Sequence, residues 1–171
     1  MAASIREEKL SFAACVTKPE ARIRAYQEVF EENRHRVYSL AFWMTDNELA
    51  AEDLMVNTFC RAFAVSSDPD GESVDRAFIA ELRELMPLGS LTLECAPCSE
   101  VLGMRGNTKR VELERALVQL PVTERMIFLF HDVERFDHAR ISRLLGVSEQ
   151  ESAYGLHQAR LRLRELLAAM A

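Results

Sequence analysis

Residues 110–167 constrain the fold most, because they have the spacing of consecutive short helices. The first predicted helix carries one apolar face with the spacing i, i+3, i+4 and i+7, and Pro121 then interrupts the pattern. This face consists of Leu113, Ala116, Leu117 and Leu120. A second helix follows at once, and its apolar residues are Met126, Ile127, Leu129, Phe130 and Val133.

The end of this stretch predicts a tight turn between two further helices. Asp137 is placed to cap a short helix, and Gly146 follows that helix where a left-handed backbone is needed. Ser148 and Glu151 have the S-x-x-E capping-box spacing that starts another helix. This order is that of a DNA-binding helix-turn-helix, although an ordinary helical hairpin explains the same pattern. The predicted buried face of the last helix is Ser152, Leu156, Ala159, Leu163 and Leu166.

Residues 1–45 predict a lead-in and a long helix. Residues 5–12 are typical of a short helix, and residues 18–20 predict a turn with Pro19 at the first position of the next helix. That helix has a solvated break at residues 31–36. Its predicted apolar face is Ile23, Tyr26, Phe30, Val37, Tyr38, Ala41 and Phe42.

Two more helices are predicted before residue 87. Asp46 or Asn47 can cap a helix over residues 48–64, which the short connection makes antiparallel to the one before it. An acidic, turn-rich loop follows, and helix resumes at about Ser73. Pro87 ends this helix, and periodicity is lost as far as Thr108.

The sequence therefore predicts an all-α fold with two small helical domains. The boundaries that we expect are residues 1–86 for the first domain, 87–110 for a linker and 111–171 for the second. Cys95 and Cys98 lie in the linker with the C-x-x-C spacing of half a zinc site or a redox pair. No second such pair completes four ligands, so two loop thiols are the simpler interpretation and no metal or cofactor is expected.

Composition excludes several classes of protein. The formal net charge of −6 does not fit a basic nucleic-acid binder, so any phosphate contact must come from a local patch. No run approaches the ~18 apolar residues of a membrane span, and we expect a cytoplasmic protein. Enzymatic activity is not expected, because no catalytic constellation or glycine-rich phosphate loop has an interpretable spacing.

Two blocks of the chain carry a family resemblance. Residues 26–63 contain Ala51-Glu52-Asp53-Leu54, Thr58-Phe59 and Arg61-Ala62-Phe63. Residues 113–166 contain the Leu120-Pro121 break and the ending Ala159-Arg160-Leu161-Arg162. In order and spacing, the blocks resemble the second and fourth conserved regions of bacterial RNA polymerase sigma factors of the extracytoplasmic-function group.

The resemblance implies a protein that binds core RNA polymerase and directs it to promoter DNA, without catalysis of its own. In such factors a helix of the second region docks on the polymerase. The resemblance therefore implies that the polymerase-binding residues here are Glu52, Asp53, Val56, Asn57 and Arg61. Acidic side chains suit a basic partner surface, so Glu52 and Asp53 are the first candidates.

The resemblance also implies two DNA-reading surfaces. Arg76 and Arg83 fall in the unit that opens and reads the −10 element. For the helix that reads the −35 element, the resemblance implies DNA contacts from Ser152, Tyr154, His157, Gln158, Arg160 and Arg162.

The DNA-reading surfaces depart from the family pattern. Glu149 and Glu151 stand where a recognition helix meets phosphates and base edges, and carboxylates repel the DNA backbone. Residues 67–86 hold six acidic and two basic side chains, and Glu81 and Glu84 oppose capture of a single strand. Val56 replaces the usual glutamine of the docking helix.

Three hypotheses follow from these features. The first is a sigma factor that initiates transcription at specific promoters. The second is a sigma-like regulatory protein that binds polymerase or an anti-sigma factor, with little promoter binding. The third gives Cys95 and Cys98 a redox or zinc-sensing role between the domains.

Overall fold

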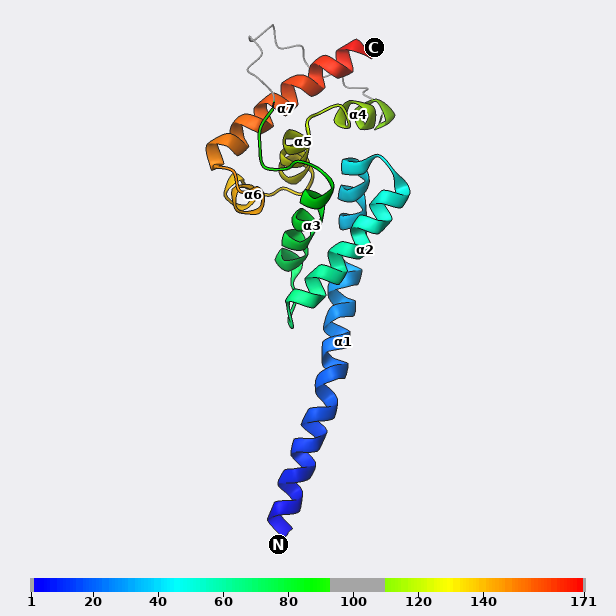
Figure 1. Ribbon diagram of the computed structural model, residues 1–171, viewed down its shortest axis with the longest axis vertical. Helices are drawn as coiled ribbons and strands as arrows, with labels where there is room; N and C mark the ends of the chain where they lie inside the picture. The colour runs from blue at the N-terminus through cyan, green and yellow to red at the C-terminus, as the bar shows by residue number, and fades with distance from the viewer. Residues whose placement is uncertain (1, 93–109, 171) are drawn as a thin grey trace.

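The computed structural model describes the backbone of residues 2–92 and 110–170, and within these ranges the side chains from residue 20 onward. Helices are the only regular secondary structure among the described residues, in agreement with the predicted all-α class. Figure 1 shows α1, α2 and α3 packed together below a second group formed by α4 to α7. The bounds are α1 Ala2–Thr45, α2 Glu48–Val65, α3 Gly71–Leu85, α4 Arg110–Leu117, α5 Val122–Phe128, the π-helical η1 Leu129–Val133, α6 His138–Leu145 and α7 Glu149–Ala169.

Local capping sets the start of α2, as the sequence predicts. Asn47 precedes α2 and its side chain accepts a hydrogen bond of 3.0 Å from the Ala50 amide. The two-residue connection turns α2 back along α1, where Tyr26 stacks on Phe63 and Phe30 meets the edge of Phe59. Such aromatic pairs stabilise the contact beyond their buried area.

The course of α1 differs from the prediction. The turn expected at residues 18–20 is wrong, because α1 continues through Pro19 without interruption. An interior proline removes one backbone hydrogen bond and usually kinks or breaks a helix, yet here the backbone on both sides of Pro19 is helical. Ile23, expected on the buried face, is exposed, because this part of α1 extends beyond the helices that cover its other end (Figure 1).

The turn between α6 and α7 is built as predicted. Asp137 caps α6 by accepting from the Arg140 amide at 2.7 Å, and Gly146 has the left-handed φ of 68°. Ser148 and Glu151 form a reciprocal capping box, with hydrogen bonds of 2.7 and 3.1 Å. The orientation of α7 relative to α6 is therefore specified by residues within the turn.

The second predicted helix of this group ends differently. Five residues at its end adopt π-helix, and the Glu134 amide donates to the Leu129 carbonyl five residues earlier. The wider turn rotates later side chains out of the α-helical register. Val133, expected on the apolar face, is therefore exposed, whereas Leu129 and Phe130 are buried.

Part of the predicted linker packs on the second helical group. Leu88 and Leu91 lie against the core, and the Gly89 amide donates to Thr123 Oγ1 at 3.1 Å. A Cβ added to Gly155 would lie 2.8 Å from Leu91 Cδ2 and 2.9 Å from Ile127 Cδ1. Glycine in α7 therefore allows the chain after α3 to pass close to this helix. Cys95 and Cys98 lie outside the described residues.

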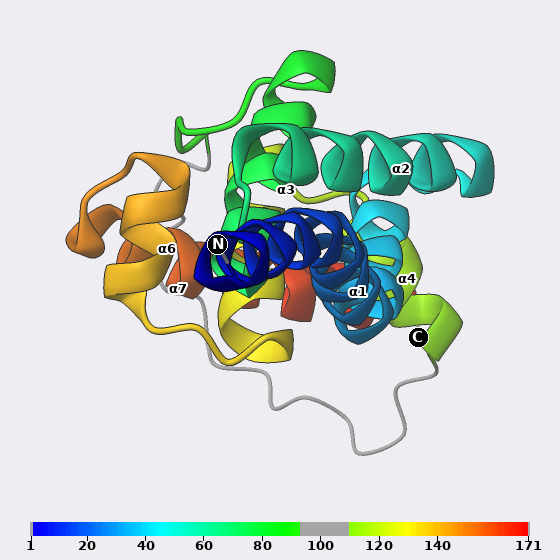
Figure 2. The same cartoon turned by 90° about the horizontal axis from the view of Figure 1, so that it is seen from below.

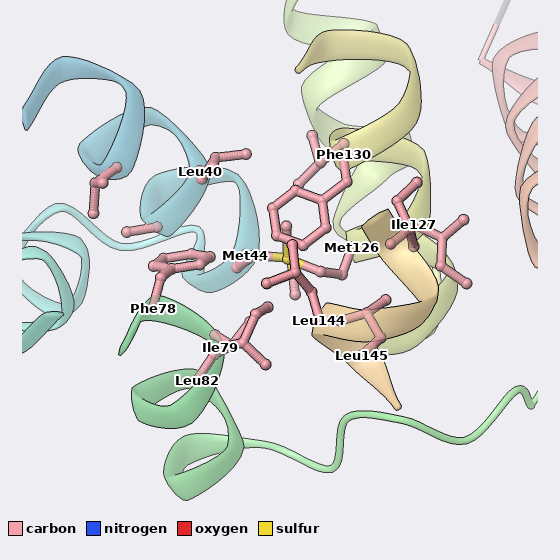
Figure 3. Close-up of a cluster of buried hydrophobic side chains, with 14 of the residues drawn as sticks. Leu40, Met44, Phe78, Ile79, Leu82, Met126, Ile127, Phe130, Leu144 and Leu145 are labelled. Atoms are coloured by element: carbon pink, nitrogen blue, oxygen red, sulfur yellow. The ribbon is translucent and has the colours of Figure 1, made fainter. Parts of the chain in front are cut away.

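The two helical groups share one apolar core. Figure 3 shows Met44 of α1 between side chains from both groups. The contributors from the first group include Leu40, Phe78, Ile79 and Leu82, and those from the second include Met126, Phe130, Leu144 and Leu145. None of the described helices is apolar enough over a sufficient length to cross a membrane.

Two stacked histidines lie beside the first turns of α6 and α7. The rings of His131 and His138 stack with their centroids 4.8 Å apart. His138 Nδ1 lies 2.9 Å from the hydroxyl of Ser152, which is buried. Burial, and then the proximity of His131, lowers the pKa of His138 from its ordinary value.

Replacing Gly146 with alanine is expected to lower the free energy of unfolding by about 1–2 kcal/mol, because a side chain crowds the backbone in the left-handed region. Urea unfolding followed by circular dichroism measures this loss. Gly71→Ala is the control, since its added Cβ would have its nearest neighbour at an ordinary 3.7 Å. Equal stability of the Gly146 variant and the wild type would contradict a left-handed backbone conformation at Gly146.

Replacing His138 with glutamine is expected to reduce the loss of stability on acidification. Because the folded-state pKa is lowered, the unfolded chain binds more protons, and the free energy of unfolding falls as the pH drops below about 6.5. Unfolding measured between about pH 8 and pH 5 should show a smaller slope for His138→Gln. His157→Gln makes the same substitution at an exposed position and is the matched control. Parallel curves for all three proteins would refute this role of His138.

Candidate functional site

One face of α2 presents an acidic and apolar stripe to solvent. Glu52, Asp53, Val56 and Asn57 are all exposed and follow the spacing of one helical face. Leu49 extends this face toward the start of α2, and it is 74% exposed. The opposite face of α2 is held by the core, so the stripe is rigidly presented. We call Leu49, Glu52, Asp53, Val56 and Asn57 the α2 stripe.

Arg61 does not join the α2 stripe. Its guanidinium pairs instead with Glu81 and Glu84 of α3, and the hydrogen bonds that it donates to these carboxylates raise the pKa of Arg61. The two acids that were expected to oppose single-strand binding therefore neutralise an arginine of the neighbouring helix. This pairing ties α2 to α3.

A cavity of about 520 Å³ lies between α2 and α3. Two arginines and two serine hydroxyls contribute to its wall, together with small apolar side chains. Arg76 donates to Glu72 at 2.7 Å, and Arg76 Nη2 lies 3.3 Å from the Ser73 hydroxyl. The lining residues are Arg61, Ala62, Val65, Ser66, Ser73, Arg76, Ala77 and Ala80. Sequence analysis missed this cavity because its walls come from two helices joined by a loop.

Arg83, the other candidate for the −10 element, contacts the second helical group. Its Nη2 donates to the Leu145 carbonyl at 2.9 Å and lies 3.5 Å from the Leu144 carbonyl. These carbonyls belong to the last turn of α6, where the helix dipole favours a cation. The structure thus separates Arg83 from Arg76, which lines the cavity.

The predicted recognition helix divides its candidate residues between core and solvent. Tyr154, His157, Arg160 and Arg162 are exposed. Ser152 is fully buried and Gln158 is only 4% exposed. The prediction that these two side chains lie on a DNA-reading face is therefore wrong. The family pattern alone did not distinguish the two faces, whereas the helical spacing from Ser152 to Leu156 and Ala159 did.

The exposed arginines of α7 have acidic partners. Arg160 Nε donates to Asp132 at 3.0 Å, and Arg162 Nη1 donates to Glu165 at 3.0 Å. Burial alone would raise the pKa of Asp132, but hydrogen bonds from Arg160 and His131 outweigh it and hold that pKa below its usual range. At the start of α7, Glu149 and Glu151 are exposed as expected.

A group of charges around the buried carboxylate of Asp75 connects the two helical groups. Asp75 of α3 accepts from Arg36 Nη1 of α1 at 2.7 Å and from Arg140 Nη2 of α6 at 2.6 Å. Arg36 Nη1 also lies 3.4 Å from Glu134. We call Arg36, Asp75, Glu134 and Arg140 the Asp75 cluster. The sequence assigned Arg36 to a solvated break and missed the cluster, because its members lie far apart along the chain.

The described residues do not place three or more His, Cys, Asp or Glu side chains together as a metal site. A redox or zinc role for Cys95 and Cys98 stays a prediction.

Comparison with known proteins agrees with this geometry. Residues 110–163 match the family described as Sigma-70, region 4. The chain is 26% identical over 170 residues to the ECF RNA polymerase sigma factor SigE of Mycolicibacterium smegmatis, covering 89% of this chain and 65% of the length of SigE.

A solved structure shows a similar fold. It is the sigma factor RpoE in complex with the anti-sigma factor NepR from Bartonella quintana, with a TM-score of 0.63 and 17% sequence identity. The match covers 84% of this chain and 96% of RpoE. The sequence matches and the helix-turn-helix of α6 and α7 agree with each other: residues 110–163 match a sigma-70 region 4, and the chain as a whole is similar to a sigma factor of the extracytoplasmic-function group, of which it spans 65% of the length.

Proposed function

We propose that this protein binds core RNA polymerase through the α2 stripe and directs it to specific promoters. The observation that carries the proposal is the exposure of Glu52, Asp53, Val56 and Asn57 on one face of a helix in the sigma-like fold. Carboxylates beside apolar side chains suit a basic protein partner, because charge steers the encounter and apolar area stabilises the complex.

In this proposal residues 1–86 act as the polymerase-binding and −10-reading domain, and residues 111–171 act as the −35-reading domain. The predicted linker over residues 87–110 connects them, and the setting is the cytoplasm. Arg61 contributes by bracing α2 against α3, and not by direct contact with polymerase.

Promoter contact is proposed for two surfaces. The cavity between α2 and α3 presents Arg61 and Arg76 where a phosphate or an unstacked base could enter. On α7, Tyr154, His157, Arg160 and Arg162 face solvent. The acidic partners of these arginines weaken phosphate binding only slightly, because an exposed ion pair contributes about 0–1 kcal/mol and a phosphate can take the place of the carboxylate.

A second candidate function is supported by the charge at the start of α7. Glu149 and Glu151 are exposed there, and Glu151 is fixed by its capping box. Two carboxylates at the leading turn repel DNA phosphates. The alternative is a sigma-like regulator that binds polymerase, or an anti-sigma factor as RpoE does in its complex with NepR, with little promoter binding.

Replacing Asp53 with arginine is expected to weaken binding to core RNA polymerase about tenfold or more, because a like charge then faces the basic partner surface. Titration of labelled full-length protein with core enzyme measures the affinity. Glu20→Arg makes the same change in charge at an exposed position of α1. Unchanged affinity for Asp53→Arg, or an equal loss for both variants, would count against the α2 stripe.

Reconstitution with core polymerase separates the two candidate functions. Protection of promoter DNA in footprints, together with transcripts from a selected promoter, is expected for a promoter-directing factor. Arg160→Ala should reduce protection near the −35 element and leave core binding unchanged. Stable core binding with no protected DNA and no transcripts at any selected promoter would favour the regulator instead.

A further inference from the structure

The middle of α7 carries an arginine whose direction is fixed by two parallel hydrogen bonds. Arg160 Nε donates to Asp132 Oδ2 at 3.0 Å, and Arg160 Nη2 donates to Asp132 Oδ1 at 2.5 Å. This fork occupies one edge of the planar guanidinium and leaves the N–H groups of its far edge available. The side chain of Arg160 is 44% exposed, so the far edge is open to a ligand.

The far edge of Arg160 matches the major-groove edge of guanine. It presents two parallel N–H groups, one from Nη1 and one from Nη2, and guanine offers the acceptors O6 and N7. His157 precedes Arg160 by about one helical turn and is also exposed, so this face of α7 is open. An arginine that is already held in one direction loses less side-chain freedom when it binds a base.

The carboxylate of Asp132 is itself held by a further side chain. His131 Nδ1 lies 2.8 Å from Asp132 Oδ1, and because an ionised carboxylate can only accept, this nitrogen carries the proton. The His131 ring stacks on His138, which contacts the buried Ser152 near the start of α7. Supporting contacts of this kind hold a functional side chain within narrow limits.

A contribution to stability does not account for the pair of Asp132 and Arg160. Their side chains are 23% and 44% exposed, and partly exposed ion pairs contribute little to folding. Asp132 also lies in the π-helical η1, and such turns are frequent at functional sites. Its carboxylate repels DNA phosphates, so Asp132 weakens general attraction for DNA. Its effect on the direction of Arg160 is the benefit that offsets this repulsion.

We propose that Asp132 is a positioning residue that directs Arg160 toward a guanine of the promoter and so sets the base preference of this part of α7. The proposal rests on the promoter-directing function proposed above, whereas the fixed direction of Arg160 is a property of the chain alone. Asp132 does not touch DNA. Removing its carboxylate should therefore lower the preference for guanine without lowering the affinity for DNA of unrelated sequence.

Nitrogen-15 NMR of the arginine Nε–H groups tests the fixed direction in the free, full-length chain. Arg160→Lys identifies the signal by its disappearance. The order parameter of this bond should be high in the wild type and should fall below about 0.6, the flexible range, in Asp132→Ala. Glu165→Ala is the matched control, because it removes the acidic partner of Arg162 on α7. It should leave the Arg160 signal unchanged.

Selection from promoter DNA randomised across the −35 element measures the base preference, with holoenzyme made from the full-length chain and core polymerase. The wild type should enrich guanine at one position, and Arg160→Ala should lose this enrichment. Asp132→Ala should lower the guanine preference at the same position about tenfold, which is within the discrimination of one arginine–guanine pair. Its affinity for DNA of unrelated sequence should not fall, whereas an unfolded variant would lose both.

Two further variants keep the test decisive. Asp132→Glu restores a carboxylate and should recover most of the guanine preference, which a loss of packing at this position would not allow. If Asp132→Ala loses helix content by circular dichroism, Asp132→Asn keeps the shape of the side chain without its charge and gives the deciding measurement.

Equal mobility of the Arg160 Nε–H bond in the wild type and in the folded Asp132 variant would overturn the positioning role. A guanine preference that survives Asp132→Ala, or the absence of any position whose guanine preference depends on Arg160, would overturn the role in base preference. Failure to bind core polymerase would refute the proposed function. The NMR measurement on the free chain would still decide whether Asp132 fixes Arg160.

Discussion

Each of the two helical groups leaves an apolar face that the other group covers, and the rest of the structure depends on this mutual burial. Met44 lies at its centre, between Phe78 of α3 and Phe130 of η1 (Figure 3). Burying one such side chain contributes about 1.5–3 kcal/mol, so several of them orient the groups more strongly than any surface pair could. Charged contacts, such as that between Asp75 and Arg140, cross between the same two groups.

Charge explains how an acidic protein can present candidate DNA-binding surfaces. The formal net charge is −6, and the candidate arginines Arg76, Arg160 and Arg162 each have an acidic partner. Such pairs lower the long-range attraction for DNA without removing the donors. The proposed binding of DNA by this chain alone should therefore be weak.

Local features of the fold were predictable, and long-range ones were not. Asn47, Asp137 and the Ser148 capping box act within one helical turn, so their residue types reveal them. The π-helix that exposes Val133 has no comparable residue pattern. Within the site, the exposed face of α2 follows from periodicity, whereas the Asp75 cluster includes a hydrogen bond between two side chains 98 residues apart, Arg36 and Glu134. The prediction that Gln158 contacts DNA was wrong, because it followed the family pattern and the helix turns this side chain toward the core.

The α2 stripe lies apart from the contact between the two helical groups. Figure 2 shows α2 along one edge of the molecule, away from α6. The stripe is exposed while α3 is held against α6, so the proposed contact with polymerase needs no rearrangement of the two groups. Because the side chains of the stripe take no part in the shared apolar core, substitutions in the stripe change the proposed binding surface without removing a core contact.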